Sequence, residues 1–286
     1  MTWSLLAVVL AIAVAIQLDG SEKAAIRWGW QPAFEVWRGK PWALLTSPLV
    51  HVELWHLVFN LYWLWILGRP VEGVLGPLRM AGFVLASALV SSAAQLAWSD
   101  QTGIGLSGVG YALFGLAWIL STRRPDLGIQ VSRQTVRLFG IWFLFGVFAT
   151  HLGLVNFGNA AHLFGAIFGM GAGFAFVERW KRAALAGLGT LLTAAALVSV
   201  LAPWSPTWNA ARAVTAYRRG NYASALSYLD RCLRRGGDPV WIAETKATVH
   251  WQAGERDRAR EDIDALRRID AKRAEKLERQ IEGRGP

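Results

Sequence analysis

Cysteine is almost absent from this sequence, in which Cys232 is the single example among 286 residues. An intrachain disulfide is therefore excluded, whichever side of a membrane the residue faces. Cysteine is among the most often buried residue types, so we expect Cys232 to be a small apolar core side chain rather than a reactive thiol.

Charged residues are also scarce, at 17% of the chain against 53% hydrophobic residues, which excludes an ordinary soluble domain. The apolar residues form separated runs of about 15 to 21 residues, the length at which a helix spans a hydrocarbon core. The first run lacks the basic start and cleavage site of a signal peptide, so we expect it to remain as a helix. The seven predicted membrane helices cover residues 3–18, 54–68, 80–98, 107–121, 137–155, 162–178 and 183–203.

The net charge of +10 suggests nucleic-acid binding at first, but its distribution indicates membrane topology instead. The loops after the third and fifth helices contain no lysine or arginine, whereas the second, fourth and sixth connections are basic. Those basic residues are Arg69, Arg79, Arg123, Arg124, Arg133, Arg137, Arg179, Lys181 and Arg182. The positive-inside rule predicts a cytoplasmic N-terminus and an external segment 204–286, provided that the seventh helix spans. We expect no nucleic-acid partner.

The composition changes at residues 203–206, which predicts a membrane domain at 1–203 and a soluble helical domain at 204–286. The segment that begins at Arg219 recurs from Ala253, an offset of 34 residues. This is the period of tetratricopeptide repeats, which the tail resembles, and the alternative is a generic helical hairpin. Two units are fewer than usually stand alone, so we expect capping by residues 272–281 or by the membrane domain.

The tail is predicted to bind a protein partner, as helical repeats commonly do. Its basic residues are expected to form a solvated face, and a lipid or nucleic-acid footprint is the alternative. These residues are Arg258, Arg260, Arg267, Arg268, Lys272 and Arg273.

Residues 19–50 are too long and too polar for a simple turn between the first two membrane helices. They contain Trp28, Trp30, Trp37 and Trp42, and tryptophan favours the boundary between membrane and water. We predict a structured loop that lies partly in the outer interface.

A serine and a histidine begin two of the predicted membrane helices, Ser107 within GLSGVGY and His162 within NAAHLFG. A hydroxyl and an imidazole at membrane depth are costly unless they pair or work, and serine needs a neighbouring base to become a nucleophile. Small residues at close to helical spacing follow both and let two helices touch. These are Gly108, Ala112 and Gly115, and Gly165, Gly169 and Gly173. The alternative is two ordinary helix-end polar groups, with glycines that serve packing alone.

A second polar motif precedes and enters the second membrane helix. His56 and Asn60 are four residues apart, so on a helix they share a face and could donate to one tetrahedral oxyanion. One such donor contributes about 3 kcal/mol. His51 and His56 are five apart, about 140° around a helix, so they do not converge as metal ligands, and we expect no metal. The alternative is a polar cluster that satisfies itself at the helix mouth.

Two further patterns carry no prediction. Residues 103–108 fit the dinucleotide motif GxGxxG, but no strand precedes them, and we expect no cofactor. Val109 replaces the last glycine of the GxSxG elbow of soluble hydrolases. No acidic residue lies where it would clearly orient His162, so we predict a dyad of Ser107 and His162 without a third member.

Together these residues resemble the rhomboid intramembrane serine proteases, over about residues 37–178. The motifs are HxxxxHxxxN, GxSG and AHxxGxxxG, with an acidic residue and a glycine after the second helix. Their positions are His51, His56, Asn60, Glu72, Gly76, Gly105, Ser107 and His162.

The resemblance implies a six-helix core that opens to the outside through a water-filled cavity. The full predicted fold is all-α, a membrane bundle of this core plus a seventh helix, followed by a small soluble helical repeat domain. Ser107 would be the nucleophile and His162 the general base. His56, Asn60 and the Ser107 amide would hold the oxyanion.

The resemblance also implies supporting residues. Tyr111 would pack against the catalytic histidine, His51 would line the cavity, and Gly105 would support the site. The family often carries a Trp-Arg pair in the first outer loop, where alignment places residues 42–43 (WA), while residues 37–38 (WR) stand five positions earlier. Either the loop is rearranged or the arginine is missing.

The predicted function is cleavage of transmembrane segments of membrane proteins by an acyl-enzyme route. The chain would be a multi-pass protein of a bacterial plasma membrane, in contact with lipid. The alternatives are a rhomboid-like protein that binds or escorts membrane proteins without catalysis, and a transporter. The transporter alternative lacks the inverted repeats that many transporters show.

Overall fold

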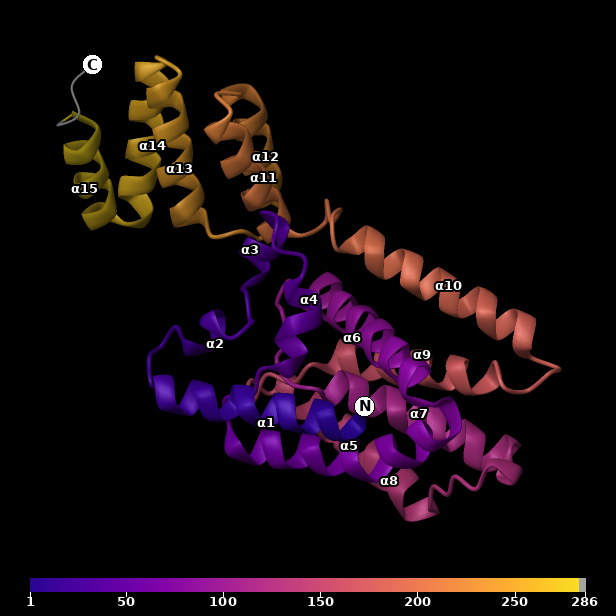
Figure 1. Ribbon diagram of the computed structural model, residues 1–286. Helices are drawn as coiled ribbons and strands as arrows, with labels where there is room; N and C mark the ends of the chain where they lie inside the picture. Colours follow the sequence, from indigo (N-terminus) through magenta and orange to yellow (C-terminus); the bar gives the residue numbers. More distant parts are fainter. Residues whose placement is uncertain (283–286) are drawn as a thin grey trace. The chain divides into compact units, whose positions relative to one another are not determined.

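The computed structural model describes residues 1–282, and every regular element within them is helical (Figure 1). The all-α fold class is confirmed. The chain forms two compact units, one from residues 1–32 and 40–200, the other from residues 33–39 and the chain from Leu201 onward. The sequence did not indicate that a piece of the first loop belongs with the C-terminal helices.

The first unit contains seven long helices, and each overlaps one of the seven apolar runs. By length and mean hydropathy alone, the first, third and seventh of them qualify as membrane spans. The long helices are α1 (Thr2–Asp19), α5 (Leu54–Leu75), α6 (Pro77–Ser99), α7 (Ser107–Arg123), α8 (Arg133–His151), α9 (Asn159–Phe174) and α10 (Lys181–Val198). Shorter helices in the connections are α2 (Ala24–Arg27), α4 (Ala43–Thr46), η1 (Ser47–Leu49) and η2 (Pro125–Leu127).

Local chemistry sets where several helices begin. Gly76 has φ +76° and is followed by Pro77 at the first position of α6. Proline has no N–H group, so it leaves no unpaired amide at a position where the helix offers no acceptor. Ser132 caps α8, because its side-chain oxygen accepts the Thr135 amide at 3.0 Å. Glu72 accepts the Thr2 amide at 2.8 Å, which ties the first turn of α1 to α5, beside which it runs (Figure 1).

Helix α7 forms the core of the first unit. It is apolar around its whole circumference, and such helices are stable only when neighbours surround them. Leu113, Leu116 and Leu120 are fully buried, and α7 packs against α5, α6 and α9.

Small residues let α7 and α9 touch through their backbones. A Cβ added to Gly165 would overlap the Gly108 carbonyl, and one added to Gly169 would overlap the Ala112 carbonyl. Gly115 faces the Ala166 carbonyl in the same way. The four-residue spacing in the sequence therefore produces a backbone contact that any larger side chain would separate.

The second unit consists of two helix pairs, a final helix and one short helix from the first loop. The pairs are α11 (Pro206–Arg218) with α12 (Tyr222–Arg234), and α13 (Pro239–Gln252) with α14 (Arg256–Ile269). Helix α15 (Ala271–Glu282) contacts α13 and α14, and α3 (Ala33–Trp37) contacts α11.

The 34-residue offset corresponds to matching positions in the two pairs. Gly220 and Gly254 turn the chain within each pair at φ +72° and +81°, a conformation that favours glycine. Ala225 and Ala259 are both fully buried, and Cys232 lies in the core of the first pair. The assignment of the tail to tetratricopeptide repeats stays a prediction.

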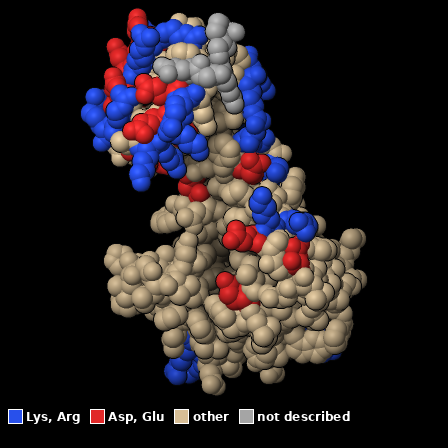
Figure 2. All heavy atoms as spheres, turned by 90° about the vertical axis from the view of Figure 1, so that its left-hand side faces the viewer, with Lys and Arg blue, Asp and Glu red and all other residues tan. Residues whose placement is uncertain are grey.

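Charged side chains gather on the second unit, whereas the surface of the first unit is nearly free of them in the view of Figure 2. Several exposed basic residues of α14 contact acidic neighbours, with Arg258 2.9 Å from Glu255 and Arg260 3.7 Å from Asp257. Such exposed pairs are worth about 0–1 kcal/mol each, so they keep the face solvated more than they stabilise it.

The first-loop tryptophans do not all share one environment. Trp28 and Trp42 are exposed, whereas Trp37 is buried within the second unit at 7% exposure. Trp37 and Arg38 therefore end a helix on the C-terminal unit, and residues 42–43 lead into α4. For Trp37 the predicted place in the membrane interface does not hold, because protein covers its ring.

We expect Gly169→Ala to lower the free energy of unfolding by about 1–3 kcal/mol, because the added Cβ forces α7 and α9 apart. Gly140→Ala on α8 is the matched control, since a Cβ there meets nothing within 4 Å. Thermal unfolding of the purified chain in detergent measures both. Equal melting temperatures for the two variants would show that the backbone contact does not hold the bundle together.

Candidate active site

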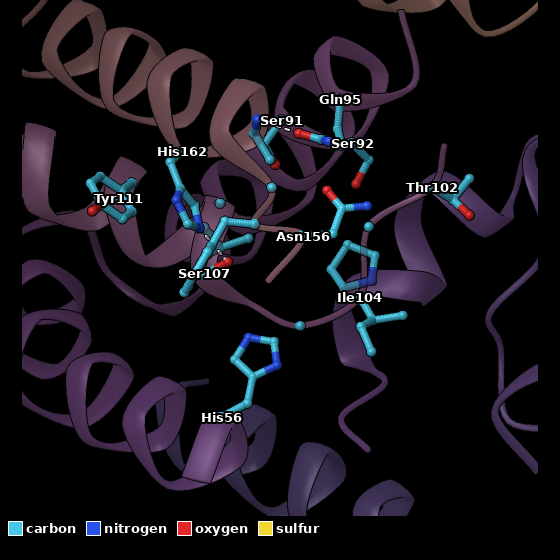
Figure 3. A pocket seen from close by; sticks show the side chains of 18 of the residues that line it. His56, Ser91, Ser92, Gln95, Thr102, Ile104, Ser107, Tyr111, Asn156 and His162 are labelled. Carbon is cyan, nitrogen blue, oxygen red and sulfur yellow. Dashed lines mark hydrogen bonds between the residues drawn. The ribbon is translucent and has the colours of Figure 1, made fainter. Parts of the chain in front are cut away.

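Ser107 and His162 meet at the N-terminal ends of two packed helices. Ser107 is the first residue of α7, and His162 lies in the first turn of α9. The His162 Nε2 atom is 2.8 Å from Ser107 Oγ, a normal hydrogen-bond distance, and Figure 3 shows the imidazole directed at the hydroxyl. The glycine contacts between α7 and α9 bring the two side chains to this distance.

The His162 ring is held by an aromatic neighbour. Tyr111 stacks on it with ring centroids 4.5 Å apart and planes 17° apart, and the Tyr111 hydroxyl donates to the Phe139 carbonyl at 3.1 Å. Nε2 can accept the serine proton only if Nδ1 carries the ring hydrogen. Within the described residues, the buried Nδ1 atom has no hydrogen-bond partner, so no carboxylate orients this ring.

Ser107 and His162 open into a cavity of about 260 Å³. Its wall comes from α5, α6, α7, α8 and α9 and from the loops that precede α5, α7 and α9 (Figure 3). Apolar groups such as Trp55, Phe59 and Trp142 line it together with a few polar side chains. This composition suits a largely apolar peptide segment that must present one polar backbone group.

His56 lies across the cavity from His162, beyond Ser107 (Figure 3). The loop before α7 passes directly against it at Gly105, which has φ +88°. A Cβ at Gly105 would overlap the His56 ring and lie 3.3 Å from His51 Nε2. Gly105 therefore serves the site by having no side chain, in a conformation that other residues adopt poorly.

His51 stands behind the cavity wall rather than on its surface. It is 1% exposed, its Nε2 accepts the Leu106 amide at 3.3 Å, and its Nδ1 is 3.2 Å from the Leu49 carbonyl. These contacts fix the backbone immediately before Ser107. The resemblance implied a cavity-lining position for His51, and the cavity described here is not lined by it.

The structure does not bring Asn60 to the cavity beside His56. The Asn60 side chain is buried, and its Nδ2 donates to the backbone carbonyl of His56 at 2.9 Å. The two side chains share one helix face, as four-residue spacing requires, but only the imidazole lines the cavity.

The two histidines before and within α5 do not resemble a metal site. Their ring centroids are 5.1 Å apart, and backbone groups already engage both nitrogens of His51. Among the described residues, no group of three or more His, Cys, Asp or Glu side chains could hold a metal ion.

Sequence reasoning missed Gln95, which lines the cavity from α6. Its Oε1 accepts the Ala161 amide at 3.2 Å, and its Nε2 donates to Ser99 Oγ at 2.9 Å. The first contact satisfies an amide in the opening turn of α9, which lacks an acceptor within the helix. An isolated amide side chain in the apolar run 80–98 was the feature that could have indicated it.

A second missed contact joins two loops at the cavity. Asn156, between α8 and α9, donates through Nδ2 to Gln101 Oε1, between α6 and α7, at 2.7 Å. Both residues line the cavity. The contact is exposed, so water competes for it and it can open at small cost.

Comparison with known proteins finds one matching family and similar proteins. Residues 38–179 match the family described as "Rhomboid domain". The chain is 38% identical over 171 residues to the rhomboid protease GlpG of Pectobacterium atrosepticum, a match that covers 59% of this chain and 60% of that protein. The chain thus spans about three fifths of the length of this relative. The family match contains Ser107, His162 and His56, and it supports a rhomboid domain at residues 38–179.

Proposed function

We propose that this chain is an intramembrane serine endopeptidase in which Ser107 and His162 form a catalytic dyad. The observation that carries the proposal is the 2.8 Å contact between Nε2 and Oγ, at a cavity, inside the segment that matches the rhomboid domain. A nucleophile within hydrogen-bond reach of a base is the arrangement that covalent peptide hydrolysis requires.

The reaction relays two protons in turn through one ring. His162 Nε2 takes the hydroxyl proton while Ser107 Oγ attacks the substrate carbonyl, and the same proton then passes to the leaving amine as the peptide bond breaks. Water next attacks the acyl-enzyme, with His162 again accepting a proton and returning it to Ser107 Oγ. Serine and histidine are both regenerated, and no cofactor enters the cycle.

The oxyanion would be held by the Ser107 amide and His56. As the first residue of α7, Ser107 has an N–H with no acceptor inside the helix, and this N–H is available to a developing negative charge. His56 lines the same cavity and can donate from its ring. Asn60 as a further donor stays a prediction, because one of its amide hydrogens is engaged with the His56 carbonyl.

The substrates we propose are transmembrane segments of membrane proteins. A peptide bond inside a helix is shielded by its own turn, so the segment must unwind locally before its carbonyl can reach Ser107. Glycine or proline near the cleavage position lowers the cost of this unwinding. The apolar wall of the cavity suits side chains that leave the lipid.

The C-terminal unit from Leu201 onward lies outside the rhomboid match, and we propose that it binds protein. Its helices bury two small apolar clusters and present a charged surface to water (Figure 2). Such a module would select or recruit substrates without taking part in the chemistry.

A fluorophosphonate should label Ser107 in the purified wild-type chain, because His162 activates the hydroxyl. Ser107→Ala should abolish the labelling, and His162→Ala should reduce it by about 10³-fold or more, because the general base is lost. Ser92→Ala is the matched control, since Ser92 lines the same cavity without contacting His162. In-gel fluorescence measures all four, and cleavage of a transmembrane reporter should follow the same order. Reporter cleavage that survives Ser107→Ala would rule out the proposal and favour a binding or escort role.

His56→Ala should lower kcat by about 10²-fold with little change in KM, because an oxyanion donor acts in the transition state. Asn60→Ala should lower kcat less, since its side chain faces a backbone carbonyl rather than the cavity. Steady-state cleavage of the reporter compares the two variants. Equal losses of kcat would show that Asn60 turns into the cavity during the reaction.

A further inference from the structure

A short helix from the first loop belongs to the core of the C-terminal unit. Helix α3 contacts α11, and the Phe34 side chain packs against a buried cluster formed by α11, α12 and α13. Val36 is 2% exposed and Trp37 is 7% exposed, although a five-residue helix has no core of its own. The members of that buried cluster are Ala210, Ala213, Ala225, Leu229, Cys232, Ile242 and Val249.

Helix α3 is organised for this contact. Arg38 follows it and places its guanidinium carbon 5.4 Å from the centre of the Phe34 ring, while its Nη1 is 3.0 Å from Glu35 Oε1. The cation covers the ring, and the acidic residue holds the cation in place. A short segment ordered in this way loses less conformational freedom on docking than an extended one.

A hollow lies beside the Phe34 ring at this contact. The Phe34 ring forms part of the lining of a cavity of about 420 Å³, together with the start of α11, the end of α12 and the start of α13. Opposite residues in that lining include Ala210, Cys232 and Trp241. The ring itself packs against the apolar cluster, and an aromatic side chain packed on an apolar helical surface is a common anchor by which such surfaces hold a peptide.

We propose that the C-terminal unit binds the first loop of its own chain, with residues 33–39 as the ligand and Phe34 as the anchor. The partner of this apolar surface is therefore an aromatic segment of the same polypeptide. The loop that precedes α4 and the tail that follows α10 are held together by this contact, in addition to the covalent chain.

The contact has a topological consequence. The loop and the tail can meet only on one side of the membrane, and six long helices, α5 to α10, lie between them. An even number of crossings returns the chain to the side it left. The number of these six helices that span must therefore be even. A bundle in which all six span meets this condition, with α7 and α9 among the spans although length and mean hydropathy alone do not identify them. This agrees with the positive-inside rule, which places the tail outside.

Cleavage of the connection tests the contact in the full chain. A protease recognition sequence is inserted between Val200 and Leu201, both exposed, in the linker between α10 and α11. After cleavage in detergent, the tail should co-elute with the membrane unit on size exclusion. Phe34→Asp should increase the free tail by about tenfold or more, because it removes the anchor. Trp28→Asp is the matched control, since it changes an exposed aromatic residue of the same loop outside α3.

If the cleaved tail separates from the membrane unit in the wild-type sequence, the proposal is overturned. Retention of the cleaved tail in Phe34→Asp to the same extent as in wild type would also overturn it. A second experiment leaves Phe34 and the rest of α3 unchanged. Glu22→Cys in the loop and Arg268→Cys in the tail, each with Cys232→Ala, are treated with a membrane-impermeant maleimide in sealed vesicles. Both sites should label from the same face, and labelling from opposite faces would exclude the contact.

Discussion

The close approach of α7 and α9 is the constraint on which the candidate site depends. Two helices whose backbones touch at Gly165 and Gly169 place the residues at their first turns within hydrogen-bond reach. In a bilayer, where lipid is as apolar as leucine, such packing must replace the hydrophobic force that assembles soluble proteins. Serine and histidine would otherwise be two isolated polar groups at membrane depth. The same contact thus stabilises the bundle and positions its chemistry.

Much of this arrangement could be predicted because membrane helices are recognisable in a sequence as long apolar runs. These runs predicted the positions of the helices, and the glycine spacing indicated that α7 and α9 would contact each other. The pair Ser107 and His162 followed from their positions at helix starts. What the sequence could not provide was the direction of side chains that depend on tertiary neighbours. Asn60 shares a helix face with His56 but turns to a backbone carbonyl, and the role of Gln95 requires knowing that α6 lies beside the start of α9.

The first loop shows the same limit at the level of domains. Composition separates the chain near residue 203, because the membrane segment is apolar and the tail is charged. A five-residue helix is too short to leave a periodic pattern, and Phe34 in a tryptophan-rich loop suggests an interface with lipid. Only packing shows that residues 33–39 join the tail. The helix pairs of the tail, by contrast, follow the 34-residue offset closely, since small residues and turn glycines recur at equivalent positions.

The unpartnered Nδ1 atom of His162 affects the lifetime of the charged ring in the proposed reaction. Soluble serine hydrolases commonly place a carboxylate behind the histidine, which shelters the imidazolium after it has taken the proton. Here Tyr111 stacks on one face of the ring, and no residue of the described part of the chain makes a hydrogen bond with Nδ1. A bare cation in such surroundings is unfavourable, so the negative oxygen of the tetrahedral intermediate becomes its main counter-ion. Positive and negative charge would then arise and vanish together, which ties activation of the serine to the presence of a correctly seated substrate.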